Sequence, residues 1–198
     1  AALELAVDNV RRFHAAIAPA DDVAVETAPG VSCRRVWRPI RAAGLYIPGG
    51  TAPLFSTLLM LALPACAAGV AEQIAVTPPA RGGAEPHPMM LAAAAACGLD
   101  GIWLVGGAQA IAALTFGAGL PKADKLFGPG NAYVAEAKRY ASGLAGGPAI
   151  DLPAGPSELL VIADGQAEPA IVAADLLSQA EHDADAQVVL VCTSSSAI

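Results

Sequence analysis

The stretch "GIWLVGGAQAIAALTF", residues 101–116, decides the fold because two glycines join an apolar segment to an alanine-rich one. The first five residues predict a strand, since a short apolar run bounded by glycine is typical of a buried strand. The residues behind the glycines predict a helix. A strand that ends in a glycine turn and leads into a helix is the repeating unit of a parallel sheet covered by helices.

The same alternation continues through most of the chain. The apolar patterns predict strands at 73–77, 101–105, 125–127, 157–164 and 187–193, and helices at 2–19, 52–69, 88–97, 108–116, 132–142 and 169–182. The segments 31–40 and 44–50 are expected to be extended. The loop 142–157 is rich in glycine and proline and predicts either a domain crossing or a binding loop. We therefore expect an α/β protein with open parallel sheets flanked by helices.

Composition excludes several classes of protein. The chain has 198 residues, of which 55% are hydrophobic, so it can bury a core. Its net charge of -7 and its lack of Lys or Arg runs argue against a nucleic-acid partner. The 4 cysteines lack CxxC spacing, which favours a reducing cytoplasm. The chain opens on a polar helix pattern without Met or a secretory signal, so we expect an excerpt of a longer protein.

Two apolar stretches raise the alternative of a membrane protein. Residues 54–71 carry no charge, and residues 89–120 carry only Asp100. Prolines and glycines interrupt both stretches, however, and no Lys or Arg cluster is present to fix an orientation. We predict no membrane span.

Three glycine turns follow predicted strands: "YIPGGTAP", "VGGAQA" and "FGPGNAY". The carboxyl ends of parallel strands meet at one edge, where free N–H groups of helix N-termini favour phosphorylated ligands. Each turn also carries one larger hydrogen-bonding side chain: Tyr46, Gln109 and Asn131. The turns offer what a dinucleotide or another phosphorylated ligand would need. None has the GxGxxG spacing, so glycines needed only for positive φ, and polar residues needed only as helix caps, remain an alternative explanation.

The helix end "SQAEH" places Gln179 and His182 three residues apart, and therefore on one helix face. Imidazole is a common zinc ligand, whereas an amide oxygen is a rare one. The alternative is a protonated histidine that interacts with the helix dipole, beside solvated Asp183 and Asp185. Because zinc takes about four ligands, a metal site would need others from outside this chain.

The loop "DLPAGPSELL" presents Ser157 at the start of a predicted strand. Its hydroxyl can bind a substrate or only cap the backbone. Because no histidine stands at triad spacing, a serine hydrolase is rejected.

Taken together and in order, "GLYIPGGTAPLFSTLLMLALPA", "VGGAQAIAAL", "FGPGNAYVAEAKR", "DLPAGPSELLVIAD" and "DLLSQAEHDADAQVVLV" closely resemble the histidinol dehydrogenase family. The resemblance covers nearly the whole chain. It implies an oxidoreductase of histidine biosynthesis that acts on a CH–OH group. Such an enzyme oxidises L-histidinol to L-histidine through a bound aldehyde and uses NAD and zinc. It further implies that Tyr46, Gln109 and Asn131 bind NAD and that Ser157 binds substrate. Gln179 and His182 would be zinc ligands that also face the substrate.

The resemblance also implies what this chain lacks. The two other zinc ligands and the Glu–His pair that moves protons lie further toward the C-terminus in the family, and the partner subunit of a homodimer lends one zinc ligand and some substrate contacts. No catalytic residue is therefore assigned here, and the chain alone is expected to be inactive.

The family's fold implies two incomplete Rossmann-like domains, one inserted in the other. Residues 46–156 would be the inserted domain on the NAD side. Residues 1–45 and 157–198 would belong to the first domain, on the zinc and substrate side. The competing hypothesis is a non-catalytic two-lobed protein that binds a metal or another ligand, and the predicted dinucleotide edge favours the dehydrogenase.

Overall fold

The structure is a computed structural model that describes residues 1–19, 22–49, 54–80, 83, 85–152, 158–181 and 186–193. By its contacts the chain divides into two compact units, Ala1–Ala154 and Gly155–Ile198. Each unit is considered by itself.

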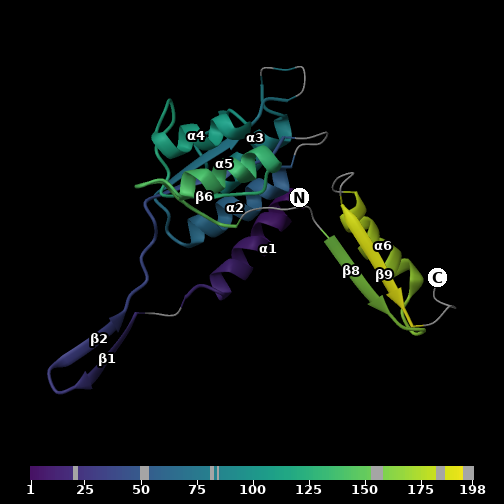
Figure 1. The fold of residues 1–198 in the computed structure, drawn as a ribbon, viewed down its shortest axis with the longest axis horizontal. Coiled ribbons are helices and arrows are strands. Elements are labelled where there is room, and N and C mark those ends of the chain that lie inside the picture. Colours follow the sequence, from purple (N-terminus) through teal and green to yellow (C-terminus); the bar gives the residue numbers. More distant parts are fainter. Residues whose placement is uncertain are drawn as a thin grey trace. The chain divides into compact units, whose positions relative to one another are not determined.

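The larger unit is built on a five-stranded sheet with the order β5-β4-β3-β6-β7. Figure 1 labels the strand β6 of this sheet and the helices around it. All four strand pairings are parallel. The strands are β3 (Ala42–Tyr46), β4 (Glu72–Thr77), β5 (Trp103–Leu104), β6 (Lys125–Phe127) and β7 (Ala149–Ile150). The chain builds outward from β3 to β5 and then returns to place β6 on the other side of β3, so the strand order reverses between β3 and β6.

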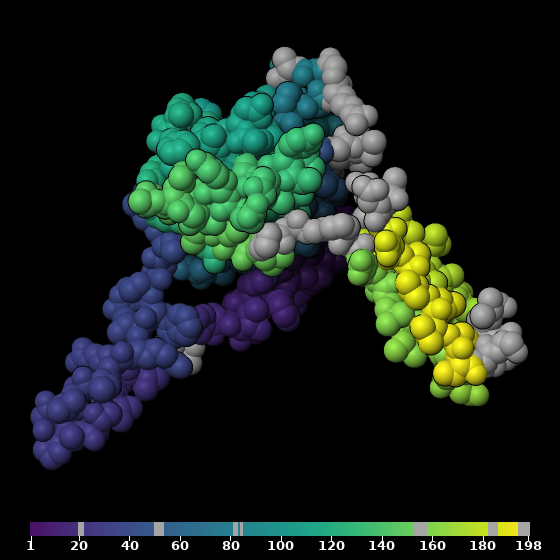
Figure 2. Space-filling model, in the orientation of Figure 1, coloured from purple at the N-terminus to yellow at the C-terminus, as the bar shows by residue number. Residues whose placement is uncertain are grey.

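Helices cover both faces of this sheet. The helices of the unit are α1 (Ala2–Ala16), α2 (Phe55–Ala67), α3 (Pro88–Cys97), α4 (Gly107–Phe116) and α5 (Ala132–Ser142). Ala43 and Leu45 of β3 belong to the core cluster with α2 and α3, whereas Ala42 and Tyr46 belong to the cluster with α4 and α5. Helix α1 packs against α2 and α3. Figure 2 shows α4 and α5 as a layer of teal and green spheres.

A hairpin of β1 (Val23–Ala28) and β2 (Val31–Arg35) precedes this sheet. The two strands are antiparallel, and every residue of both is exposed. The sequence predicts only the second strand of the pair, as part of an extended segment.

The smaller unit contains one strand-helix-strand motif: β8 (Glu158–Ala163), α6 (Pro169–Ala180) and β9 (Gln187–Cys192). The strands pair in parallel, so this motif has the same construction as β3-α2-β4. Exposure alternates along β8, where Leu159 and Val161 are partly buried while Leu160 and Ile162 are exposed. One face of the pair is therefore open in the described residues.

The structure confirms the α/β class and most of the expected elements. The predicted helices 88–97 and 132–142 and the strand 125–127 have the expected bounds. Pro64 lies inside α2. The predicted start of an inserted domain, Tyr46, is the last residue of β3, and the whole strand belongs to the five-stranded sheet. Over the described residues, no helix has the length and apolarity needed to cross a bilayer.

Candidate functional site

Four strands of the five-stranded sheet end at one edge. Because they are parallel, the carboxyl ends of β3, β4, β5 and β6 point the same way. The strand order reverses between β3 and β6, and the carboxyl edge at such a reversal is where open α/β sheets bind ligands. The glycine turns 105–110 and 127–133 leave the sheet at this edge, and so do residues 47–49 of the first turn, whose residues 50–53 lie outside the described part of the chain.

Tyr46 ends β3, the strand beside the reversal. Its side chain is buried, with 4% of the residue exposed, between the sheet and α4. The hydroxyl oxygen accepts a hydrogen bond of 3.1 Å from the backbone nitrogen of Gly107 at the start of α4. Because this bond uses a lone pair, the hydroxyl keeps its own hydrogen for a second partner. Tyr46 thus connects the end of β3 to the helix that starts after β5.

The second turn brings α4 close to the chain that leaves β4. A Cβ on Gly106 would lie 2.6 Å from the Cβ of Pro78, so a side chain at this position would collide with the neighbouring turn. Gln109 lies in the first turn of α4 and is exposed. At this edge the Gly107 N–H of α4 is bound by the Tyr46 hydroxyl, and the exposed Gln109 amide is available.

Asn131 begins α5 after the third turn. Its Oδ1 atom accepts a hydrogen bond of 3.1 Å from the backbone nitrogen of Val134, which confirms the predicted helix cap. The residue is exposed, and its side-chain amide keeps two N–H groups that can donate. The cap explains why an asparagine stands here, and it leaves the residue able to contact a ligand as well.

Gly128 is the residue that leaves β6 on the other side of the reversal. Its φ is +112°, and a Cβ there would lie 2.0 Å from the carbonyl oxygen of Tyr46. Asp151 accepts a hydrogen bond of 2.7 Å from the Gly128 nitrogen, and the Nζ atom of Lys138 donates one of 2.9 Å to the Gly128 carbonyl. Lys138 and Asp151 also form an ion pair. Both polar backbone groups of Gly128 are therefore bound by this charged pair.

Sequence reasoning missed Lys138 and Asp151. A signal for the lysine was present, because Val134, Lys138 and Ala141 share the buried side of α5 at helical spacing. A lysine in such an apolar row needs an anionic partner. Nothing in the spacing identifies Asp151 as that partner.

The predicted metal and substrate residues lie on the smaller unit. Gln179 is in the last turn of α6 and is partly buried. His182 and Ser157 lie outside the described residues, so the convergence of Gln179 and His182 on one metal stays a prediction. Across the part of the chain that is described, no group of three or more His, Cys, Asp or Glu side chains is placed to hold a metal.

Comparison with known proteins gives one consistent family. The model of the family "Histidinol dehydrogenase" matches residues 1–198. Histidinol dehydrogenase from Escherichia coli K12 is 55% identical over 192 residues, which are 96% of this chain and 42% of that protein. The enzyme from Salmonella typhimurium LT2 is 56% identical with the same coverage. The chain thus spans less than half the length of these relatives.

A solved structure agrees with the sequence comparison. The crystal structure of histidinol dehydrogenase from Elizabethkingia anophelis matches with a TM-score of 0.90 at 50% identity. It covers 98% of this chain, which corresponds to 44% of the solved chain. A family match over every residue, together with this structural likeness, shows that the chain belongs to the histidinol dehydrogenase family.

Proposed function

We propose that this chain is part of a zinc- and NAD-dependent dehydrogenase that oxidises L-histidinol to L-histidine in two steps through a retained aldehyde. The observation that carries this proposal is the family match over residues 1–198. The relatives are about twice as long as the chain, so the activity belongs to the full-length protein.

The carboxyl edge of the five-stranded sheet suits the NAD role proposed for Tyr46, Gln109 and Asn131. Its available groups are mainly hydrogen-bond donors: the Tyr46 hydroxyl, the Asn131 amide and the N-termini of α4 and α5. Donors of this kind suit the pyrophosphate and ribose oxygens of a dinucleotide. The nicotinamide of NAD, when bound, supplies the hydride acceptor. The chain's residues would fix where it lies.

Gln179 and His182 are proposed to hold zinc and to face the substrate, and Ser157 to bind the substrate. An amide oxygen and an imidazole nitrogen form a chemically acceptable mixed donor pair, which supplies two of about four ligands. Bound zinc supplies a fixed positive centre that orients the nitrogen atoms of histidinol. The Glu–His pair that moves protons would lie outside this chain.

Several further parts of the proposal rest on the family resemblance alone. They are the homodimer, the cytoplasmic location, and the division into an inserted domain at 46–156 with flanks at 1–45 and 157–198. Gln179, the proposed zinc ligand that the structure describes, belongs to the smaller unit.

The proposal is tested with the full-length protein that contains this chain. We expect it to reduce two NAD per histidinol and to lose activity with a zinc chelator, whereas the 198-residue chain alone is inactive. A full-length protein that binds zinc but forms no NADH with histidinol would favour the non-catalytic metal-binding alternative.

Zinc content provides a second measurement that does not depend on activity. Gln179→Ala should lower the zinc content of the purified full-length protein, because it removes one ligand. Gln166→Ala changes an exposed glutamine in the turn before α6 and serves as the matched control. Equal zinc content in both variants would remove Gln179 from the proposed metal site.

A further inference from the structure

The pair formed by Lys138 and Asp151 lies beside the proposed NAD edge and has no assigned role. The Lys138 side chain is 3% exposed and the Asp151 side chain 23%. The Nζ atom of Lys138 contacts Oδ1 of Asp151 and the carbonyl of Gly128. Asp151 also accepts hydrogen bonds of 2.7 Å each from the nitrogens of Gly128 and Leu152. These hydrogen bonds connect the residue after β6, helix α5 and the two residues that follow β7 in the chain.

Stability alone does not explain an ion pair whose lysine is buried and whose aspartate is partly exposed. Taking the Lys138 ammonium out of water costs several kcal/mol, although the Asp151 side chain keeps part of its contact with solvent, and apolar side chains of similar volume are often as stabilising as such a pair. A buried pair is better suited to fixing geometry, because its hydrogen bonds are satisfied in only one arrangement. Here the group fixed is the backbone of Gly128, whose nitrogen and carbonyl are both bound.

Gly128 precedes Asn131, the N-cap of α5, by three residues. Gly128 lies against the Tyr46 carbonyl, at the point where the strand order reverses. A short turn then leads from Gly128 to Asn131 and the N-terminus of α5. A shift of Gly128 would therefore move the Asn131 amide and the first N–H groups of α5 relative to the end of β3.

We propose that Lys138 and Asp151 are positioning residues for the nucleotide cofactor, acting through Gly128 to place Asn131 and the start of α5. This inference rests on the proposed NAD-dependent function. The pair is neutral overall, so it holds the backbone without adding net negative charge near an anionic pyrophosphate.

The test uses three variants of the full-length protein: Lys138→Met, Asp151→Asn and the double variant. The double variant removes both charges at nearly constant side-chain volume, which avoids leaving one buried charge unpaired. We expect the KM for NAD to rise about tenfold in each single variant and in the double variant, while kcat and the KM for histidinol change less than about twofold. An unchanged KM for NAD in a folded double variant would overturn the proposal.

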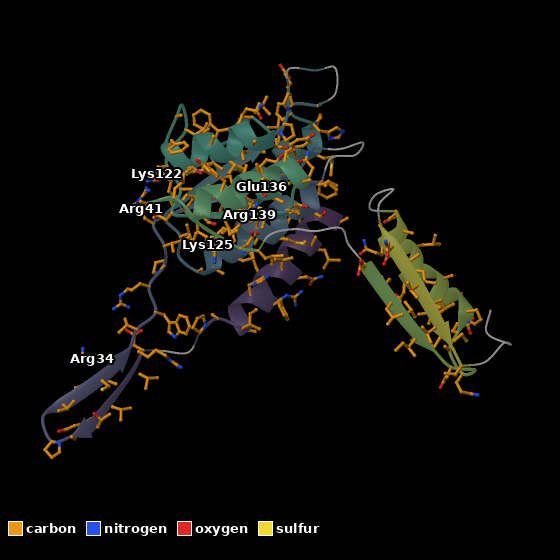
Figure 3. All side chains as sticks on the ribbon, in the orientation of Figure 1. Arg34, Arg41, Lys122, Lys125, Glu136 and Arg139 are labelled. Atoms are coloured by element: carbon orange, nitrogen blue, oxygen red, sulfur yellow. The ribbon has the colours of Figure 1, made fainter. Side chains whose placement is uncertain are left out.

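The matched control is the exposed pair Glu136 and Arg139 on the same helix, labelled in Figure 3. The double substitution Glu136→Gln and Arg139→Met also removes one positive and one negative charge, both from the helix that carries Lys138. It should leave the KM for NAD unchanged. An equal rise in KM in this control would show that any loss of charge on α5 has the same effect, which would also overturn the proposal.

A measurement without ligand separates this proposal from the proposed function. Hydrogen exchange of the Gly128 and Val134 amides in the 198-residue chain should be faster in the double variant than in the wild type or the control. Unchanged exchange, or failure of the double variant to fold, would overturn the positioning role. Failure of the wild-type full-length protein to reduce NAD would overturn the proposed function, and the exchange rates would still decide whether the pair orders this turn.

Discussion

The two strand-helix-strand motifs β3-α2-β4 and β8-α6-β9 have the same construction and very different surroundings. All five residues of β3 are buried, because helices cover both faces of its sheet and β4 and β6 pair with its two edges. In β8, exposure alternates, and Leu160 and Ile162 are 56% and 71% exposed. The same motif is thus complete in one unit and covered on a single face in the other.

The sequence of β8 is that of a strand buried on both faces, although only one face of β8 is covered in the described residues. A strand with one solvated face usually alternates apolar and polar residues, whereas a parallel strand buried on both faces is apolar throughout. The β8 sequence "ELLVIA" is apolar in all positions after Glu158. On the open face, Leu160 and Ile162 have exposed apolar neighbours in β9, Val189 and Val191. Such a sequence is typical of a parallel strand that is covered on both faces, as β3 is.

The largest expected change in the free energy of unfolding comes from a substitution in β3, the strand that is buried on both faces. Leu45 of β3 is 1% exposed within the cluster formed with α2 and α3. Leu45→Ala in the 198-residue chain should lower the free energy of unfolding by about 2–5 kcal/mol, because it removes buried surface and leaves a cavity. Urea unfolding followed by tryptophan fluorescence measures this, because Trp37 and Trp103 both lie in the larger unit.

Leu160→Ala is the control for the same substitution in β8. Tryptophan fluorescence should give it the same midpoint as the wild type, and circular dichroism should show a change below about 0.5 kcal/mol for an exposed leucine. A loss equal to that of Leu45→Ala would mean that the two motifs are equally enclosed, contrary to the comparison.

The next effect concerns a thiol that is buried in the larger unit. Burial raises the pKa of Cys97, in α3, from 9.0 to about 11, against the opposing charge of Arg11. Below pH 9 the thiol is protonated in both states. Between pH 9 and about 11 only the unfolded chain releases the proton, so stability should fall as pH rises, by about 2–3 kcal/mol from this group.

The measurement compares wild type with Cys97→Ala, because lysines and tyrosines also titrate in this range. Between pH 9 and about 11, the free energy of unfolding of the variant should fall less than that of the wild type. A slope identical to that of the wild type would contradict the raised pKa. Thiol labelling should also be slower at the buried Cys97 than at Cys192, which is partly exposed in β9.

Local sequence patterns predicted those helices and strands well whose start and end signals lie within their own residues. Helix α3 begins at Pro88 and ends before Gly98, whose left-handed conformation caps it, and both signals are readable in the sequence. The strands β1 and β7 were not predicted. Strand β7 has two residues, and β1 has no buried face that would impose an alternating pattern.

The sequence allowed the turns that form the candidate site to be predicted. The carboxyl edge, the Asn131 cap and the position of Tyr46 followed from glycine turns placed after strands. The Lys138–Asp151 pair was not predictable, because its partners are 13 residues apart and meet only when β7 pairs with β6. Folding, and not spacing, creates that contact.

A substitution on the open face of β8 has an expected effect as small as that of Leu160→Ala, and it tests whether that face is covered in the full-length protein. Ile162 is 71% exposed on the open face of β8, so Ile162→Ala in the 198-residue chain should change the free energy of unfolding by less than about 0.5 kcal/mol. In the full-length protein, a covering layer would bury this side chain, and the same substitution should cost about 1–3 kcal/mol. Hydrogen exchange of the β8 amides in both proteins, with and without the substitution, measures the difference. A cost that stays below about 0.5 kcal/mol at full length would show that the apolar face of β8 remains open there, and that an apolar parallel strand does not require two covering layers in this family.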